Sequence, residues 1–137
     1  MQIKERMTKP PITAPPEMPI QEALKLMRGR GIRRLPVIDK KGKLIGIVSD
    51  RDLLHASPSK ATSLSVWELN YLLSKVTLKD VMTKNVITVT PETPVHEAAR
   101  IMAEKKIGGL PVMLGGKVIG MITETDLFRV LLELLPA

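Results

Sequence analysis

The sequence has no cysteine, few aromatic residues and no long apolar run. Without cysteine, the chain has no disulfide bonds, no thiolate metal ligands and no cysteine nucleophile. Aromatic residues make up 2% of the 137 residues, too few for a protein that stacks bases of single-stranded nucleic acid. No apolar stretch approaches the roughly 18 residues of a membrane span, and the N-terminus lacks the apolar segment of a signal peptide. We therefore expect a cytoplasmic protein that makes no membrane contact.

The residues that are present indicate a folded, basic protein. Hydrophobic residues are 44% and charged residues 26% of the chain, enough to bury a core in one domain or in two tightly joined halves. The net charge of +7 favours partners that carry phosphate groups. A basic nucleic-acid-binding protein is one alternative, although no helix-turn-helix or RNA-binding signature is present. Its basic rim would consist of Lys40, Lys41, Lys43, Lys105, Lys106 and Lys117.

An internal repeat organises the chain. At an offset of 75 residues, 15 of the 32 aligned pairs from Met7/Met82 to Ile38/Met113 are identical. The offset then falls to 74 because the second copy is one residue shorter in its hairpin. This identity indicates a duplicated unit of about 50 residues. We expect a first domain over residues 7–60, a linker over 61–78 and a second domain over 79–137.

Each copy shows the pattern strand, helix, strand, strand, helix. Short strands are expected at residues 12–13 and 87–89, each followed by a turn that contains proline. Apolar residues at helical spacing come next, followed by hairpins over residues 35–48 and 110–122. A second helix begins at Ser49 in the first copy and at Thr123 in the second. This order predicts an α/β (α+β) fold built from two β-α-β-β-α repeats.

The linker is expected to contain a short helix, because Ser65 and Glu68 stand at the spacing of a capping box. Two of the three aromatic residues, Trp67 and Tyr71, also lie in the linker. We expect their rings to fill the seam between the two copies, with partner binding as the alternative.

Signatures of catalysis are missing. The two histidines, His55 and His96, occupy different positions of the repeat, so no duplicated catalytic or metal-binding group includes them. The sequence has no Walker loop, no nucleophile elbow and no glycine-rich dinucleotide fingerprint. We expect a non-catalytic protein that holds no metal.

A hydroxyl residue and a carboxylate begin the second helix of each copy. Ser49 and Asp52 follow Gly46, and Thr123 and Asp126 follow Gly120 at the same spacing. A hydroxyl at a helix start, with unpaired backbone N–H groups and the positive end of the helix dipole behind it, forms a site for anions. A carboxylate three positions later can accept hydrogen bonds from a ribose diol. The same spacing is also a helix-capping pattern that needs no ligand. Both interpretations remain open, and they are compatible.

These repeated motifs resemble the cystathionine-β-synthase (CBS) domain. The resemblance rests on Met-Thr before a short strand ending in Thr, Pro-x-x-Ala at a helix start, Leu-Pro-Val, and Gly-x-x-Ser/Thr-x-x-Asp, all present twice. Two such domains in tandem form a Bateman module with pseudo-twofold symmetry. Residues 49–59 and the linker most resemble acetoin-utilisation-type CBS proteins.

The resemblance implies a binding site for an adenine nucleotide in the cleft between the copies. Asp52 and Asp126 would hold ribose, and Ser49 and Thr123 would contact phosphate. The phosphate-binding cations would be Arg33, Arg34 and Arg51. The adenine slots would be lined by Ile12, Thr13, Pro36, Ile87, Thr88 and Pro111.

The second copy lacks the cations of the first. Gly108, Gly109 and Thr125 stand at the positions of Arg33, Arg34 and Arg51. We therefore expect one strong nucleotide site, although the sequence does not say which cleft receives the arginines.

We expect a regulatory sensor of AMP, ADP, ATP or another adenosyl ligand, with AMP or ATP favoured and a protein target unidentified. The alternative is a ligand-free interaction or dimerisation module.

The last helix is apolar on more than one face, with leucines at 127, 131, 132, 134 and 135. Such a helix must be buried on more than one side, so we expect a homodimer, or a further domain that covers it.

Overall fold

The computed structural model describes residues 1–57 and 64–136. The predicted boundary between the first domain and the linker, at residues 60 and 61, lies outside the described residues, as do residues 58 and 59 of the segment that resembles acetoin-utilisation proteins. The chain forms two compact units, one of Thr13–Val86 and one of Met1–Ile12 with Ile87–Ala137. We call these the first-repeat unit and the second-repeat unit.

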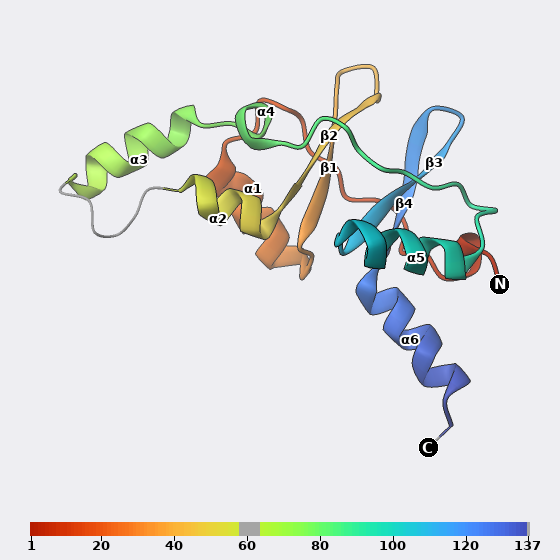
Figure 1. Ribbon diagram of the computed structural model, residues 1–137. Helices are drawn as coiled ribbons and strands as arrows, with labels where there is room; N and C mark the ends of the chain where they lie inside the picture. Colours follow the sequence, from red (N-terminus) through yellow and green to blue (C-terminus); the bar gives the residue numbers. More distant parts are fainter. Residues whose placement is uncertain (58–63, 137) are drawn as a thin grey trace. The chain divides into compact units, whose positions relative to one another are not determined.

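The first-repeat unit has a two-stranded sheet with helices (Figure 1). Its elements are α1 (Ile20–Arg30), β1 (Arg34–Ile38), β2 (Leu44–Ser49), α2 (Asp50–Ala56), α3 (Val66–Lys75) and α4 (Leu78–Val81). The second-repeat unit has the same sheet. Its elements are η1 (Ile3–Glu5), α5 (Val95–Lys105), β3 (Gly109–Leu114), β4 (Lys117–Thr123) and α6 (Glu124–Leu134). The predicted α/β (α+β) class is confirmed.

Each sheet is an antiparallel strand pair with one isolated parallel bridge beside it. β1 pairs with β2 and β3 pairs with β4 in antiparallel register. The leading strand of each repeat is reduced to one parallel bridge, Ala14 to Val37 and Val89 to Val112. Proline follows within two residues in both copies, and because proline has no N–H group it cannot extend the ladder.

The first helix of each repeat buries the apolar stripe that its spacing predicts. Ile20, Ala23 and Met27 of α1 are buried, as are the corresponding residues of α5. Helix α1 ends at Gly31, whose φ of 64° is left-handed and therefore favours glycine.

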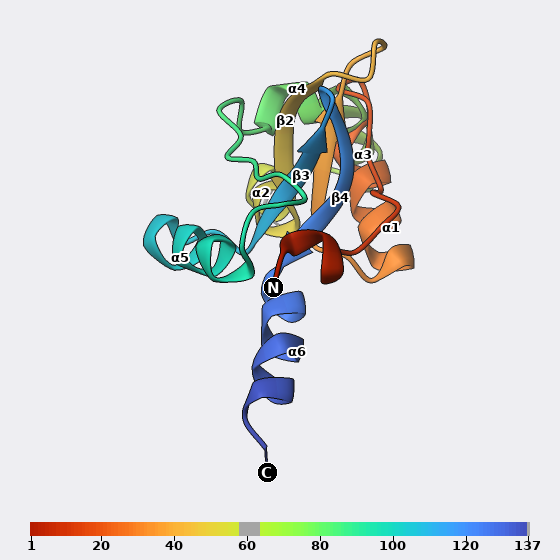
Figure 2. The same cartoon turned by 90° about the vertical axis from the view of Figure 1, so that its right-hand side faces the viewer.

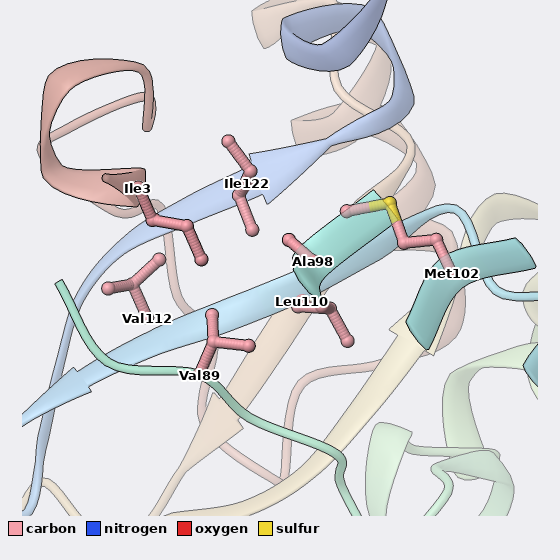
Figure 3. Close-up of a cluster of buried hydrophobic side chains, with 7 residues drawn as sticks. All are labelled: Ile3, Val89, Ala98, Met102, Leu110, Val112 and Ile122. Atoms are coloured by element: carbon pink, nitrogen blue, oxygen red, sulfur yellow. The ribbon is translucent and has the colours of Figure 1, made fainter. Parts of the chain in front are cut away.

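The N-terminal segment contributes to the core of the second-repeat unit. Ile3 of η1 is fully buried among side chains of α5, β3 and β4 (Figure 3). The complementary segment, α4 with its buried Leu78, belongs to the first-repeat unit. Each unit therefore contains a segment that precedes the other repeat in sequence. The sequence does not predict η1 or α4, because both are single helical turns.

Helix α3 is confirmed, and the hydroxyl of its N-cap Ser65 accepts a hydrogen bond of 3.2 Å from the Glu68 N–H group. The expectation that its aromatic rings fill a seam is wrong, because Trp67 is 85% and Tyr71 61% exposed. Helix α3 has no buried residue; an amphipathic pattern near a linker does not say whether its apolar face is covered.

Helix α6 points away from the β3–β4 pair (Figures 1 and 2). Only Asp126 and Val130 of this helix are buried, and the large apolar residues of its outer turns are exposed. Across the ranges that the structure describes, no helix is long and apolar enough to cross a lipid bilayer.

Candidate functional site

The first-repeat unit places a capped carboxylate where β2 turns into α2. The Ser49 N–H group donates to Oδ2 of Asp52 at 2.8 Å, and the Asp52 N–H group donates to the Ser49 hydroxyl at 3.1 Å. The motif is therefore a capping box. Asp52 is nevertheless exposed, and the hydrogen bonds seen to its carboxylate in the described residues reach only one of the two oxygens. Capping thus leaves this carboxylate accessible to a ligand.

The three candidate arginines lie beside this capping box. Arg34 stands opposite Ser49 in the β1–β2 register, and the carbonyl of Arg33 accepts a hydrogen bond of 2.8 Å from the Asp50 N–H group. Arg51 is the second residue of α2, and it is exposed, as is Arg33. Arg33, Arg34 and Arg51 therefore belong to the same compact unit as Ser49 and Asp52.

The second-repeat unit repeats this backbone without the cations. Gly109 stands opposite Thr123, and the Glu124 N–H group donates to the Gly108 carbonyl at 3.0 Å, as Asp50 does to Arg33. Thr125, at the position of Arg51, is exposed. The two candidate sites therefore share a backbone and differ in charge.

Asp126 differs from Asp52 in its surroundings. It is only 4% exposed, and its Oδ2 accepts hydrogen bonds from the N–H group and the hydroxyl of Thr123 at 2.9 and 3.2 Å. Its Oδ1 accepts a hydrogen bond of 3.2 Å from the hydroxyl of Thr8 and lies 3.7 Å from a guanidinium nitrogen of Arg129. Both oxygens of this carboxylate thus have protein partners.

The glycine of each motif is explained by a close approach of the chain. A Cβ atom on Gly46 would lie 2.7 Å from Cγ of Met82, and one on Gly120 would lie 2.9 Å from the carbonyl oxygen of Thr8. Thr83 exchanges two backbone hydrogen bonds with Ile47 at this point. The Met-Thr sequence before each repeat therefore packs on the glycine of the other repeat, and no ligand is needed to explain the glycine.

The six candidate adenine residues fall into two groups. Pro36 and Pro111 are buried in β1 and β3, and their carbonyls accept hydrogen bonds from the N–H groups of Ala14 and Val89 at 3.0 and 3.1 Å. Ile12 is the last residue of the N-terminal segment of the second-repeat unit and Thr13 is the first residue of the first-repeat unit. Both are half-buried, whereas Ile87 and Thr88 are exposed. Thr13 and Thr88 directly precede the bridge residues Ala14 and Val89 in the chain.

One further surface feature consists of residues outside these candidate sets. A shallow open hollow on α3 is lined by Trp67, Glu68, Tyr71 and Leu72, none of which is a candidate ligand residue. Among residues 1–57 and 64–136, no cluster of three or more His, Asp or Glu side chains is arranged to hold a metal ion.

Solved structures resemble this chain over nearly its full length. A putative acetoin utilisation protein of Vibrio cholerae is 33% identical with a TM-score of 0.79, and the match covers 98% of this chain and 92% of the other. CBSX2 in complex with AMP is 32% identical with a TM-score of 0.81, and the match covers 98% of this chain and 99% of CBSX2. A third structure is the CBS domain pair of protein MJ0100 in complex with 5′-methylthioadenosine and S-adenosyl-L-methionine. It is 32% identical with a TM-score of 0.80, and the match covers 96% of this chain and 95% of the other.

Curated relatives differ in length. The chain spans 92% of a CBS domain-containing protein of Dictyostelium discoideum, to which it is 35% identical over 97% of its own residues. It spans only 22% of an L-aspartate semialdehyde sulfurtransferase of Methanocaldococcus jannaschii, to which it is 34% identical over 93% of its residues. It spans 21% of an inosine-5′-monophosphate dehydrogenase of Korarchaeum cryptofilum. The family model described as the CBS domain matches residues 2–59 and 78–133, so this chain belongs to the CBS domain family and carries a tandem pair of these domains.

Proposed function

We propose that this chain is a non-catalytic regulatory module that binds an adenosyl ligand, with AMP as the first candidate. The observation that carries the proposal is the grouping, in one unit, of the exposed Asp52 with Ser49 and three arginines. Related CBS pairs hold AMP, or 5′-methylthioadenosine and S-adenosyl-L-methionine, which supports the adenosyl group as the shared element of recognition. ADP and ATP remain candidates because the cations suit further phosphates.

Each residue of this group has a distinct role in the proposal. A ribose diol donates hydrogen bonds to Asp52, and hydrogen bonds to a carboxylate are stronger than neutral ones. The Ser49 hydroxyl and the guanidinium groups of Arg33, Arg34 and Arg51 bind phosphate, for which the planar guanidinium is suited. Thr13 and Pro36 contact adenine. The second repeat has Asp126, Thr123, Thr88 and Pro111 at the corresponding positions but lacks the arginines, and Ile12 and Ile87 complete the two apolar sets. The proposal therefore places the ligand at the Asp52 repeat.

Isothermal titration calorimetry with AMP, ADP, ATP, S-adenosylmethionine and 5′-methylthioadenosine, and with GTP as the comparison ligand, tests the proposal. The variant Asp52→Asn keeps an oxygen for the cap and removes the charge, so we expect it to lose at least about tenfold in affinity, the effect of one charged hydrogen bond. Asp80→Asn is the matched control, because Asp80 forms the same capping box with Thr77 in the same unit. Absence of adenosyl binding below millimolar concentration, or equal losses in both variants, would contradict the proposal and favour a ligand-free interaction module.

We also propose that the module is a homodimer in which α6 supplies the contact. Phe128, Leu132 and Leu135 are 60%, 75% and 63% exposed, an apolar surface that a second copy would cover. Size-exclusion chromatography with light scattering should give twice the chain mass, and Leu132→Glu should shift it to the monomer mass. A monomer at micromolar concentration for the unaltered chain contradicts this proposal.

A further inference from the structure

The two carboxylates of the repeated motif, Asp52 and Asp126, differ in exposure although their backbone surroundings are the same. Both units pair the hydroxyl residue with the strand before it and begin a helix one residue later. Asp52 is exposed, whereas Asp126 is 4% exposed. The helix cap is present in both, so capping does not account for the difference.

The N-terminal segment, residues 1–12, contacts Asp126 directly. The N–H and carbonyl groups of Thr8 exchange hydrogen bonds of 2.8 and 3.0 Å with Met121 of β4. This bridge places the Thr8 hydroxyl 3.2 Å from Oδ1 of Asp126. That oxygen is the one that the cap does not use, since Thr123 donates to Oδ2. Thr8 therefore donates to the oxygen that the cap leaves free and that a ribose diol would reach.

The N-terminal segment is anchored by residues that precede Thr8. Ile3 is fully buried in the core of the second-repeat unit, and the Lys4 N–H group donates to the Pro91 carbonyl at 2.9 Å. Arg6 forms a two-point hydrogen-bonded ion pair with Glu133 at the far end of α6, one contact of which measures 2.7 Å. Thr8 is thus held in place by contacts that do not involve Asp126.

The first repeat offers a comparison within the same chain. Thr83 stands at the position of Thr8 and forms the same two-hydrogen-bond bridge, with Ile47, at 3.0 and 2.9 Å. In the part of the chain that the structure describes, no side-chain hydrogen bond joins Thr83 to Asp52, and Asp52 remains exposed. The position +3 from the carboxylate also differs, with Arg129 beside Asp126 and His55 after Asp52.

We infer that Thr8 closes the second repeat: while the N-terminal segment is in place, Asp126 is held by Thr8 and takes no ligand, and the chain binds one adenosyl ligand, at the Asp52 repeat. This inference rests on the proposed function for its ligand. Thr8 is a positioning residue, since it acts by holding Asp126.

A ligand-independent measurement tests the closure itself. Carboxyl groups are labelled with a carbodiimide and glycinamide, and labelling is read residue by residue by mass spectrometry. Asp52 should label several-fold faster than Asp126 in the unaltered chain. Thr8→Val should raise the labelling of Asp126 several-fold, whereas Thr8→Ser should not. Thr83→Val is the matched control and should leave both rates unchanged. Equal labelling of Asp52 and Asp126, or no effect of Thr8→Val, overturns the inference.

Calorimetry with AMP then tests the consequence for binding. We expect the unaltered chain to bind one equivalent of AMP. This binding should be lost in Asp52→Asn and kept in Asp126→Asn. Thr8→Val should bind a second, weaker equivalent of AMP, whereas Thr83→Val should not. Two equivalents in the unaltered chain, or one that is lost only in Asp126→Asn, overturns the inference while the proposed function stands. Absence of any AMP binding counts against the proposed function, and the labelling result still decides whether Thr8 closes Asp126.

Discussion

At the scale of single residues, the glycine of each repeated motif is a packing requirement. Because Gly46 faces the Met82 side chain, Gly46→Ala should lower the free energy of unfolding by about 1–3 kcal/mol, the usual cost of overpacking. Urea denaturation measures this change. Gly29→Ala is the control, since nothing lies within 4 Å of its added Cβ and alanine is favoured inside a helix by roughly 0.5–1 kcal/mol. Equal stability of the two variants would show that Met82 does not constrain Gly46.

A second residue-scale prediction concerns the ion pair of Arg6 and Glu133. The hydrogen bond from Arg6 lowers the pKa of Glu133 from its ordinary value of 4.5. A lowered folded-state pKa means that the pair stabilises the fold above the unfolded pKa, and that this stability is lost as the pH falls through the folded pKa. The melting temperature of the unaltered chain should therefore exceed that of Glu133→Gln slightly at pH 7, and the difference should shrink as the pH falls below the unfolded pKa. The effect is small because the pair is on the surface. A difference that persists unchanged at pH 3 argues against the ion pair as its cause.

At the scale of elements, helix α3 depends on its own cap more than on packing. It spans 10 residues and buries none, and an isolated helix of that length is marginal in water. Ser65→Ala removes the hydroxyl that accepts from Glu68, a loss of about 1 kcal/mol of helix stability. Hydrogen exchange of amides 69–75 should accelerate accordingly while exchange in α1 and α5 stays unchanged. Slower exchange throughout, or an effect spread over α1, would indicate that α3 is held by tertiary contacts.

At the scale of the whole molecule, each compact unit depends on a segment that precedes the other repeat. Ile3 and Leu78 are both fully buried, so replacing either by alanine should cost about 2–5 kcal/mol. Ile3→Ala should first accelerate hydrogen exchange in α5, β3 and β4, although it lies next to the first repeat in sequence. Leu78→Ala should first accelerate exchange in α1, β1 and β2. The reverse pattern would contradict the division into units, and each variant serves as the control for the other.

The sequence by itself determined the duplication, the fold class, the family and the identity of the candidate residues. Those features follow from local spacing and from identities between the two copies, both of which can be read without a three-dimensional structure. Helix α3 and the buried faces of α1 and α5 were predictable for the same reason, since apolar periodicity and a capping box are short-range signals.

Only the tertiary structure decided which segment packs on which repeat and how the two carboxylates differ. Thr8 and Asp126 are 118 positions apart, and no local pattern predicts a contact at that separation. The single helical turns η1 and α4 were missed because their stability comes from burying Ile3 and Leu78 in distant cores. The exposure of Trp67 was likewise a matter of tertiary packing. The candidate residues could therefore be named from the sequence, whereas the exposure of each carboxylate depended on long-range contacts.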